Sequence, residues 1–142
     1  MQRALVAWAV RRTFAAFSRR DWEFNTLLLD PDRYEFLVGD RFAQAPGMKD
    51  RYFGAPGYLE AMMAVLDIFP RTVVEVEHHG WVPDGRLAIG LRFHAAGASS
   101  GVEGDQRALI AVELREGLVV RHWYWWDVEA GSRSLGIEPP RR

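Results

Sequence analysis

The strongest constraint on the fold is the second half of the chain, where apolar and polar residues alternate through a series of long segments. These segments are Thr72–Val82, Arg86–Ala95, Gln106–Arg115 and Leu118–Val128. Alternation with a period of two is typical of strands, because successive side chains point to opposite faces of a sheet. The turns PDG and REG join consecutive segments, so the sequence predicts an antiparallel meander.

The first half of the chain is typical of helices. Apolar residues at steps of three and four predict a helix over residues 4–20. Asp21 is a suitable N-cap for a second, shorter helix over Trp22–Leu29. A third helix is expected to begin near Pro56, which suits a first helical turn, and to end at Pro70.

One short strand, Arg33–Val38, is predicted between the second and third helices, and Gly39–Phe53 lacks periodicity and reads as a loop. Helices must bury their apolar sides, and a strongly twisted sheet can curl around them and enclose a cavity. We therefore expect an α+β fold in which a cone-shaped, strongly curved, mixed or antiparallel sheet wraps around N-terminal helices. Residues 1–142 are expected to form one domain, with an ordered core over about 3–137 and a tail over 138–142.

Composition excludes several classes of partner. The 18 basic and 19 acidic residues give a net charge of -1, which provides no general attraction to nucleic acid or to an anionic membrane. The N-terminal apolar run Ala4–Val10 is interrupted by two arginines and is shorter than a membrane span of about 20 residues. We expect a cytoplasmic protein with neither a nucleic acid nor a membrane partner.

Metal and cofactor sites are also not expected. The chain has no cysteine and four histidines. His78 and His79 are adjacent in a predicted strand, so their side chains point to opposite faces and cannot easily bind one ion. No phosphate-binding loop or dinucleotide fingerprint is present. The carboxylates of Glu75 and Glu77 share one strand face and are expected to face solvent. Arg92 and His94 also share a face, which is expected to meet solvent or an interface.

The last strand combines large aromatic rings with a histidine in the stretch RHWYWWDVEAG. Strand alternation divides these residues between two faces of the sheet. One face carries Val120, His122, Tyr124 and Trp126. The other carries Arg121, Trp123, Trp125 and Asp127.

Several strings together resemble the SnoaL-like branch of the nuclear transport factor 2-like superfamily, whose fold is also described as a cystatin-like α+β roll. They are LLLDPDRYEF, RYFGAPGYLEAM, GASSG, REGLVVRHWYWWD and EAGSRSLGI, in this order over nearly the whole chain. The resemblance implies the cone-shaped fold, an interior ligand pocket and a homodimer formed through the opposite face of the sheet. Trp123 and Trp125 would then be buried against the partner subunit.

The residues that carry chemistry in related families are mostly replaced. Polyketide cyclase members read HWD on the last strand and use the aspartate as acid and base, whereas this chain has Tyr124 there. A phenol with a pKa of about 10 is a poor base at neutral pH. At the three positions that serve ketosteroid isomerase relatives, the chain has Phe36, Thr13 and Ile110, none of which performs the corresponding role. Asp127 is retained and is expected to cap the following turn.

The resemblance places His122 and Tyr124 on the cavity side, as candidate catalytic residues. Further residues are predicted to line the pocket: Phe14, Phe17, Tyr34, Phe36, Phe53, Met62, Ile110, Val120 and Trp126. One hypothesis is binding of a small apolar or aromatic molecule, with isomerase, cyclase or hydratase chemistry if His122 moves protons. The alternative is a noncatalytic dimeric scaffold whose cavity is filled by side chains, in which His122 is a core histidine. The sequence leaves open whether the chain is an enzyme.

Overall fold

The computed structural model describes residues 3–39, 48–68, 70–96 and 103–139. Four helices are present in this part of the chain: α1 (Arg3–Ser18), α2 (Trp22–Leu27), α3 (Gly54–Ile68) and α4 (Val128–Leu135). Six strands accompany them: β1 (Glu35–Val38), β2 (Arg51–Phe53), β3 (Val73–Trp81), β4 (Leu87–Ala96), β5 (Glu103–Arg115) and β6 (Leu118–Trp125). The fold is α+β, as the sequence predicted.

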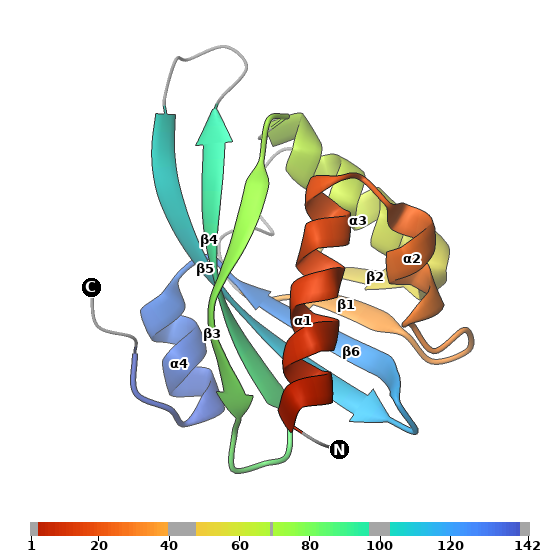
Figure 1. The fold of residues 1–142 in the computed structure, drawn as a ribbon, viewed down its shortest axis with the longest axis vertical. Helices are drawn as coiled ribbons and strands as arrows, with labels where there is room; N and C mark the ends of the chain where they lie inside the picture. Colours follow the sequence, from red (N-terminus) through yellow and green to blue (C-terminus); the bar gives the residue numbers. More distant parts are fainter. Residues whose placement is uncertain (1–2, 40–47, 69, 97–102, 140–142) are drawn as a thin grey trace.

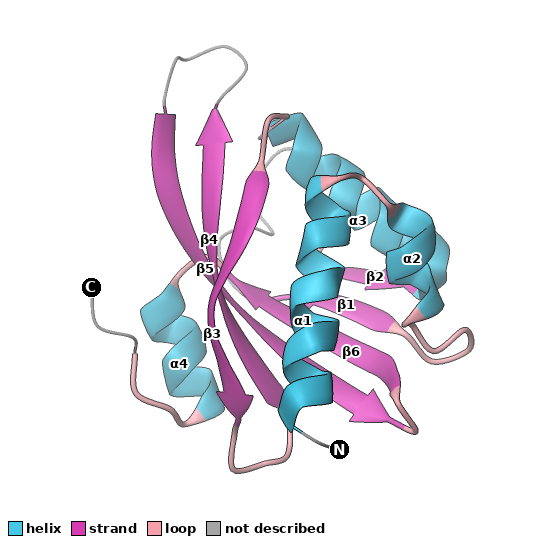
Figure 2. Ribbon diagram, in the orientation of Figure 1, coloured by secondary structure: helices cyan, strands magenta, loops and turns pink. Residues whose placement is uncertain are grey.

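The six strands form one curved, open sheet in the order β2-β1-β6-β5-β4-β3. The pairs from β3 to β6 are antiparallel, which confirms the predicted meander. The sheet is mixed, because the short strand β1 lies parallel to β6. Figure 2 shows α1, α2 and α3 on one side of the sheet and α4 on the other. The bend of the sheet around the first three helices produces the cone expected from the sequence.

Two features were not predicted. Part of the expected loop is a strand, because Arg51–Phe53 pairs with β1, with Glu35 opposite Phe53. The end of the predicted ordered core, to which the sequence assigned no helix, forms α4, which begins after Asp127 and ends at Gly136 in the left-handed conformation. The Asp127 carboxylate accepts a hydrogen bond from the backbone N–H of Ala130, so this aspartate is the N-cap of α4.

Apolar side chains form one cluster on each side of the sheet. The larger cluster fills the space between the sheet and α1–α3. The smaller cluster packs α4 against the opposite face and includes Val82, Ala88, Leu109, Ala111, Trp125 and Leu135. The two clusters share β4, β5 and β6, whose alternate residues contribute to one or the other. Among the described residues, no helix is both long and apolar enough to cross a membrane.

Candidate functional site

A cavity lies inside the larger cluster, between the sheet and the first three helices. Its lining is almost entirely apolar and aromatic: Phe14, Phe17, Asn25, Phe36, Tyr58, Met62, Val65, Val74, Leu91, Phe93, Ile110, His122 and Tyr124. Of the described residues that line it, none carries a formal charge at neutral pH. The volume open to the centre of a water molecule is about 50 Å³. This space holds a few water molecules but is smaller than a benzene-binding cavity of about 150 Å³.

His122 reaches this cavity because β6 pairs with β1. Phe36 lies beside His122 in the parallel register, and the two ring centroids are 6.1 Å apart. The hydroxyl of Tyr34 lies 2.7 Å from Nδ1 of His122, and the two rings are nearly perpendicular at 86°. Burial lowers the pKa of His122 to about 4 and raises the pKa of Tyr34 well above its usual range. Both groups are therefore neutral at pH 7.

The hydrogen bond between Tyr34 and His122 links the direction of the hydroxyl proton to the tautomer of the imidazole. Tyr34 is 2% exposed, and its hydroxyl has only the imidazole as partner among the described residues. A buried hydroxyl is stabilised when its proton finds an acceptor, which favours the tautomer in which Tyr34 donates to Nδ1 and the imidazole proton is on Nε2. His122 borders the cavity as an uncharged imidazole.

A second polar pair lies on the helical side of the cavity. Nδ2 of Asn25 in α2 donates to the hydroxyl of Tyr58 in α3 over 3.1 Å. Burial raises the pKa of Tyr58 to about 12, so this phenol also stays neutral. The rings of Tyr34 and Tyr58 meet edge to face at 6.2 Å, which places the two polar pairs side by side. Sequence analysis missed Asn25 and Tyr58, because Asn25 shares its short helix with the polar residues Glu23 and Thr26 and nothing in the sequence sets it apart from them.

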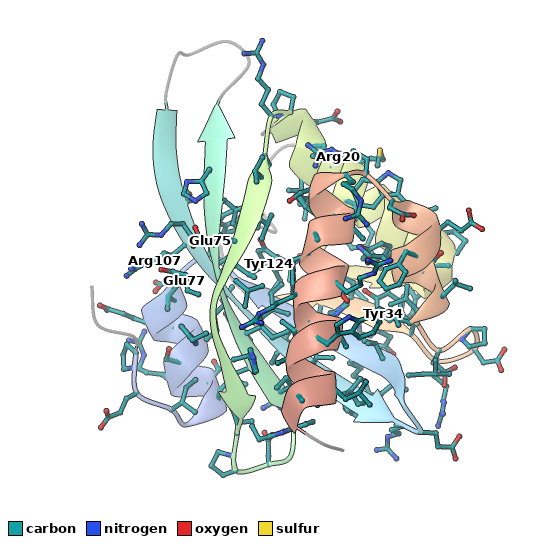
Figure 3. The ribbon with its side chains drawn as sticks, viewed as in Figure 1. Arg20, Tyr34, Glu75, Glu77, Arg107 and Tyr124 are labelled. Atoms are coloured by element: carbon teal, nitrogen blue, oxygen red, sulfur yellow. The ribbon has the colours of Figure 1, made fainter. Side chains whose placement is uncertain are left out.

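Tyr124 lies on the inner face, as predicted. Its side chain is placed between the sheet and α1 (Figure 3), and the residue is 5% exposed. Its ring contacts other aromatic rings, with centroid distances of 6.0 Å to Phe36, 6.3 Å to Phe93 and 5.5 Å to Trp126. The predicted lining residues Phe14, Phe17, Phe36, Met62 and Ile110 also border the cavity.

Four predicted lining residues do not border the cavity. Tyr34 lies behind His122, and Trp126 packs against Phe93 at 4.9 Å, so both support the lining from outside. The prediction that Phe53 lines the cavity is wrong. Phe53 is 60% exposed, because its neighbour Tyr52 occupies the inward position of β2.

The prediction that Val120 lines the cavity is also wrong, and a β-bulge in the pairing of β5 with β6 explains why. The pairing of β5 with β6 shifts between Glu113, which lies opposite Arg121, and Leu114, which lies opposite Val119. The extra residue changes the phase of the strand, so Val119 rather than Val120 joins the larger cluster. Strict alternation holds only for the part of β6 after the bulge, where His122 and Tyr124 lie.

The two outward tryptophans do not form the apolar patch that the sequence suggested. Trp125 is 5% exposed within a single chain, because α4 covers it. This corrects the expectation that it needs a partner subunit for burial; α4 was not foreseen. Trp123 is partly buried, and the guanidinium of Arg86 lies 4.6 Å from the centre of its ring.

The outer surface of β3, β4 and β5 is charged. A carboxylate oxygen of Glu75 lies 3.0 Å from Nε2 of His94. Glu77 forms ion pairs with Arg92 at 3.2 Å and with Arg107 at 3.1 Å. Figure 3 shows Glu75, Glu77 and Arg107 together on this side, away from Tyr124. The predicted outward orientation of these carboxylates is confirmed. In the part of the chain that the structure describes, no three histidine or acidic residues lie close enough to hold a metal ion.

Comparison with known proteins identifies the fold. No family model and no curated protein matches the chain. Among solved structures, TerC co-crystallised with polyporic acid superimposes with a TM-score of 0.72 at 16% identity, over 91% of this chain and 95% of that one. An NTF2-like protein of unknown function from Burkholderia pseudomallei gives 0.73 at 16% identity with the same coverage. A putative isomerase from Bacillus subtilis gives 0.68 at 15% identity, over 93% of each chain.

These similarities extend over nearly the whole length of both chains, while the identities are low enough that they establish the fold and no activity. They agree with the resemblance seen in the sequence. The chain therefore has the nuclear transport factor 2-like fold, which SnoaL-like proteins share.

Proposed function

We propose that the chain binds a small, uncharged and mostly apolar molecule in the interior cavity. The observation that carries this proposal is His122, a neutral imidazole that borders a mostly apolar cavity and is hydrogen-bonded to Tyr34. With its proton on Nε2, His122 offers the cavity an uncharged N–H donor. Such a lining suits a ligand with one hydrogen-bond acceptor, such as a carbonyl oxygen, on an apolar body. A charged ligand would lose its hydration without finding a counter-charge among the described lining residues.

The same geometry favours binding over proton transfer. An imidazole with a pKa of about 4 is a weak base, and efficient general acid–base catalysis at neutral pH needs a pKa near 7. No carboxylate borders the described cavity to replace it. In this proposal His122 orients and polarises the ligand, and Tyr34 is a positioning residue.

Binding requires some rearrangement of the lining. The free volume of about 50 Å³ does not admit a ring-sized molecule as it stands. Met62 is a suitable residue to move, because its unbranched side chain has three rotatable bonds. Phe14 is only partly buried and lies at the helical side of the cavity. TerC, which has the same fold, was co-crystallised with polyporic acid, and this supports ligand binding by proteins of this shape.

The proposal can be tested with two probes of nearly equal shape, cyclopentanone and methylenecyclopentane. Each is titrated into the isotope-labelled protein, and binding is followed by NMR chemical shifts. We expect the ketone to bind about fivefold more tightly, since one hydrogen bond contributes about 1 kcal/mol. The preference should disappear in His122→Phe. If neither probe binds, the cavity is a filled core, and the chain is a noncatalytic scaffold.

A further inference from the structure

The interior contains a buried polar atom that the proposed function does not use. Asn25 is 3% exposed, and its Nδ2 is engaged by Tyr58, but its Oδ1 has no hydrogen-bond partner among the described residues. Buried amide oxygens in folded proteins are nearly always paired, because leaving one unpaired after removal from water is costly. Since Asn25 borders the cavity, an occupant of the cavity can supply the missing donor.

Packing alone does not explain this asparagine. Its neighbours on the cavity wall include Phe17, Phe36 and Met62, so a leucine would suit the site better. The bond to Tyr58 fixes one end of the amide and holds the other end in place. Rotating the amide by 180° would exchange the two ends, and one of them would still lack a partner.

We propose that Asn25 is a second binding residue of this cavity, which accepts a hydrogen bond from a hydroxyl group of the ligand. This inference rests on the proposed function and narrows the ligand class. The ligand is an apolar molecule with two polar groups: an acceptor such as a carbonyl for His122, and a hydroxyl for Asn25. A hydroxyl serves Asn25 in either orientation of the amide, because it both donates and accepts.

The test compares cyclopentanone with 2-hydroxycyclopentanone and 3-hydroxycyclopentanone, with NMR titration as the readout. We expect at least one hydroxyketone to bind the parent protein about tenfold more tightly than cyclopentanone. Asn25→Leu should remove this gain, and an amide NMR spectrum as well dispersed as that of the parent shows that the variant is folded. Asn25→Ala is the second variant, for the case in which leucine fills the cavity.

Ser132 provides a matched control. It is buried in α4 on the opposite face of the sheet, and its Oγ also lacks a hydrogen-bond partner among the described residues. Ser132→Ala should leave the affinities for all three probes unchanged.

The outcomes separate the two proposals. If cyclopentanone binds but neither hydroxyketone binds more tightly, the role of Asn25 is wrong, as when a retained water molecule satisfies its oxygen, and the proposed function stands. If the gain survives in both Asn25 variants, the role of Asn25 is also wrong. If cyclopentanone does not bind the parent protein, both proposals fail.

Discussion

The two faces of β6 contrast sharply, although both are rich in aromatic residues. The inner face presents His122 and Tyr124 to a cavity that retains free volume. The outer face presents Trp125 to α4, where the ring is packed so closely that a Cβ added to Gly131 would lie 2.9 Å from it. The difference teaches that the aromatic content of the strand does not assign its role. What covers each face decides whether a ring packs the core or borders a site.

The largest expected effect comes from removing the buried ring on the outer face. Trp125→Ala should lower the free energy of unfolding by about 3–5 kcal/mol, because the cavity left behind cannot collapse completely. Trp123→Ala should cost about 1 kcal/mol, because Trp123 is only partly buried against the smaller cluster and its ring also contacts the guanidinium of Arg86. Urea denaturation measures both. Equal losses would contradict the assignment of Trp125 to the packed side.

The inner face should dominate the pH dependence of stability. His122 has a pKa of about 4 in the folded protein and about 6.5 when unfolded, so the unfolded state binds more protons between these values. Stability is therefore fully present above pH 6.5 and falls as the pH drops towards 4, by on the order of 3 kcal/mol.

Denaturation curves at pH 7, 6, 5 and 4 test this dependence. His122→Phe is the control, and its loss over the same range should be smaller by that amount. The carboxyl of Asp30 titrates lower, because its hydrogen bonds with Arg33 hold its pKa below the usual range. If His122→Phe loses as much stability between pH 7 and pH 4 as the parent does, His122 is not buried as a neutral ring.

A tighter test of the outer face is the addition of one methyl group. Gly131→Ala should cost about 1–3 kcal/mol, because the new Cβ meets the ring of Trp125. Gly80→Ala is the matched control, since nothing lies within 4 Å of a Cβ there. Thermal unfolding of the two variants separates them. A neutral Gly131→Ala would mean that α4 is packed loosely.

A smaller effect than that of Trp125→Ala is expected from removing the hydroxyl of Tyr34, which is hydrogen-bonded to His122. Tyr34→Phe should lower the free energy of unfolding by about 1–2 kcal/mol, because Nδ1 of His122 is left without its donor. A double-mutant cycle with His122→Phe should give a coupling energy of about 1 kcal/mol. Additive losses would place the two side chains out of contact.

Much of the fold could be predicted from the sequence, because the meander and the first three helices follow from periodicity. The strand at Arg51–Phe53 could not, since three residues are too few to show a period and the strand exists through its pairing with β1. The helix α4 was missed because Gly131 and its serines are poor helix formers. Asp127 and Gly136, its two caps, were the available signals.

Part of the site could also be predicted from the sequence, because the period of a strand indicates which side chains face inward. Strand alternation correctly predicted that His122 and Tyr124 face inward. It failed at Val120, because the bulge after Val119 changes which residues face inward. Asn25 was beyond sequence reasoning, because its importance lies in a bond to Tyr58, 33 positions along the chain.

The most direct test of the account is the protonation state of His122, read from the ¹⁵N NMR shifts of its imidazole between pH 5 and 8. We predict a neutral ring throughout this range, with the proton on Nε2 and with Nδ1 accepting a hydrogen bond. A ring that becomes charged near pH 6.5, or that carries its proton on Nδ1, would contradict the proposed donor in the cavity.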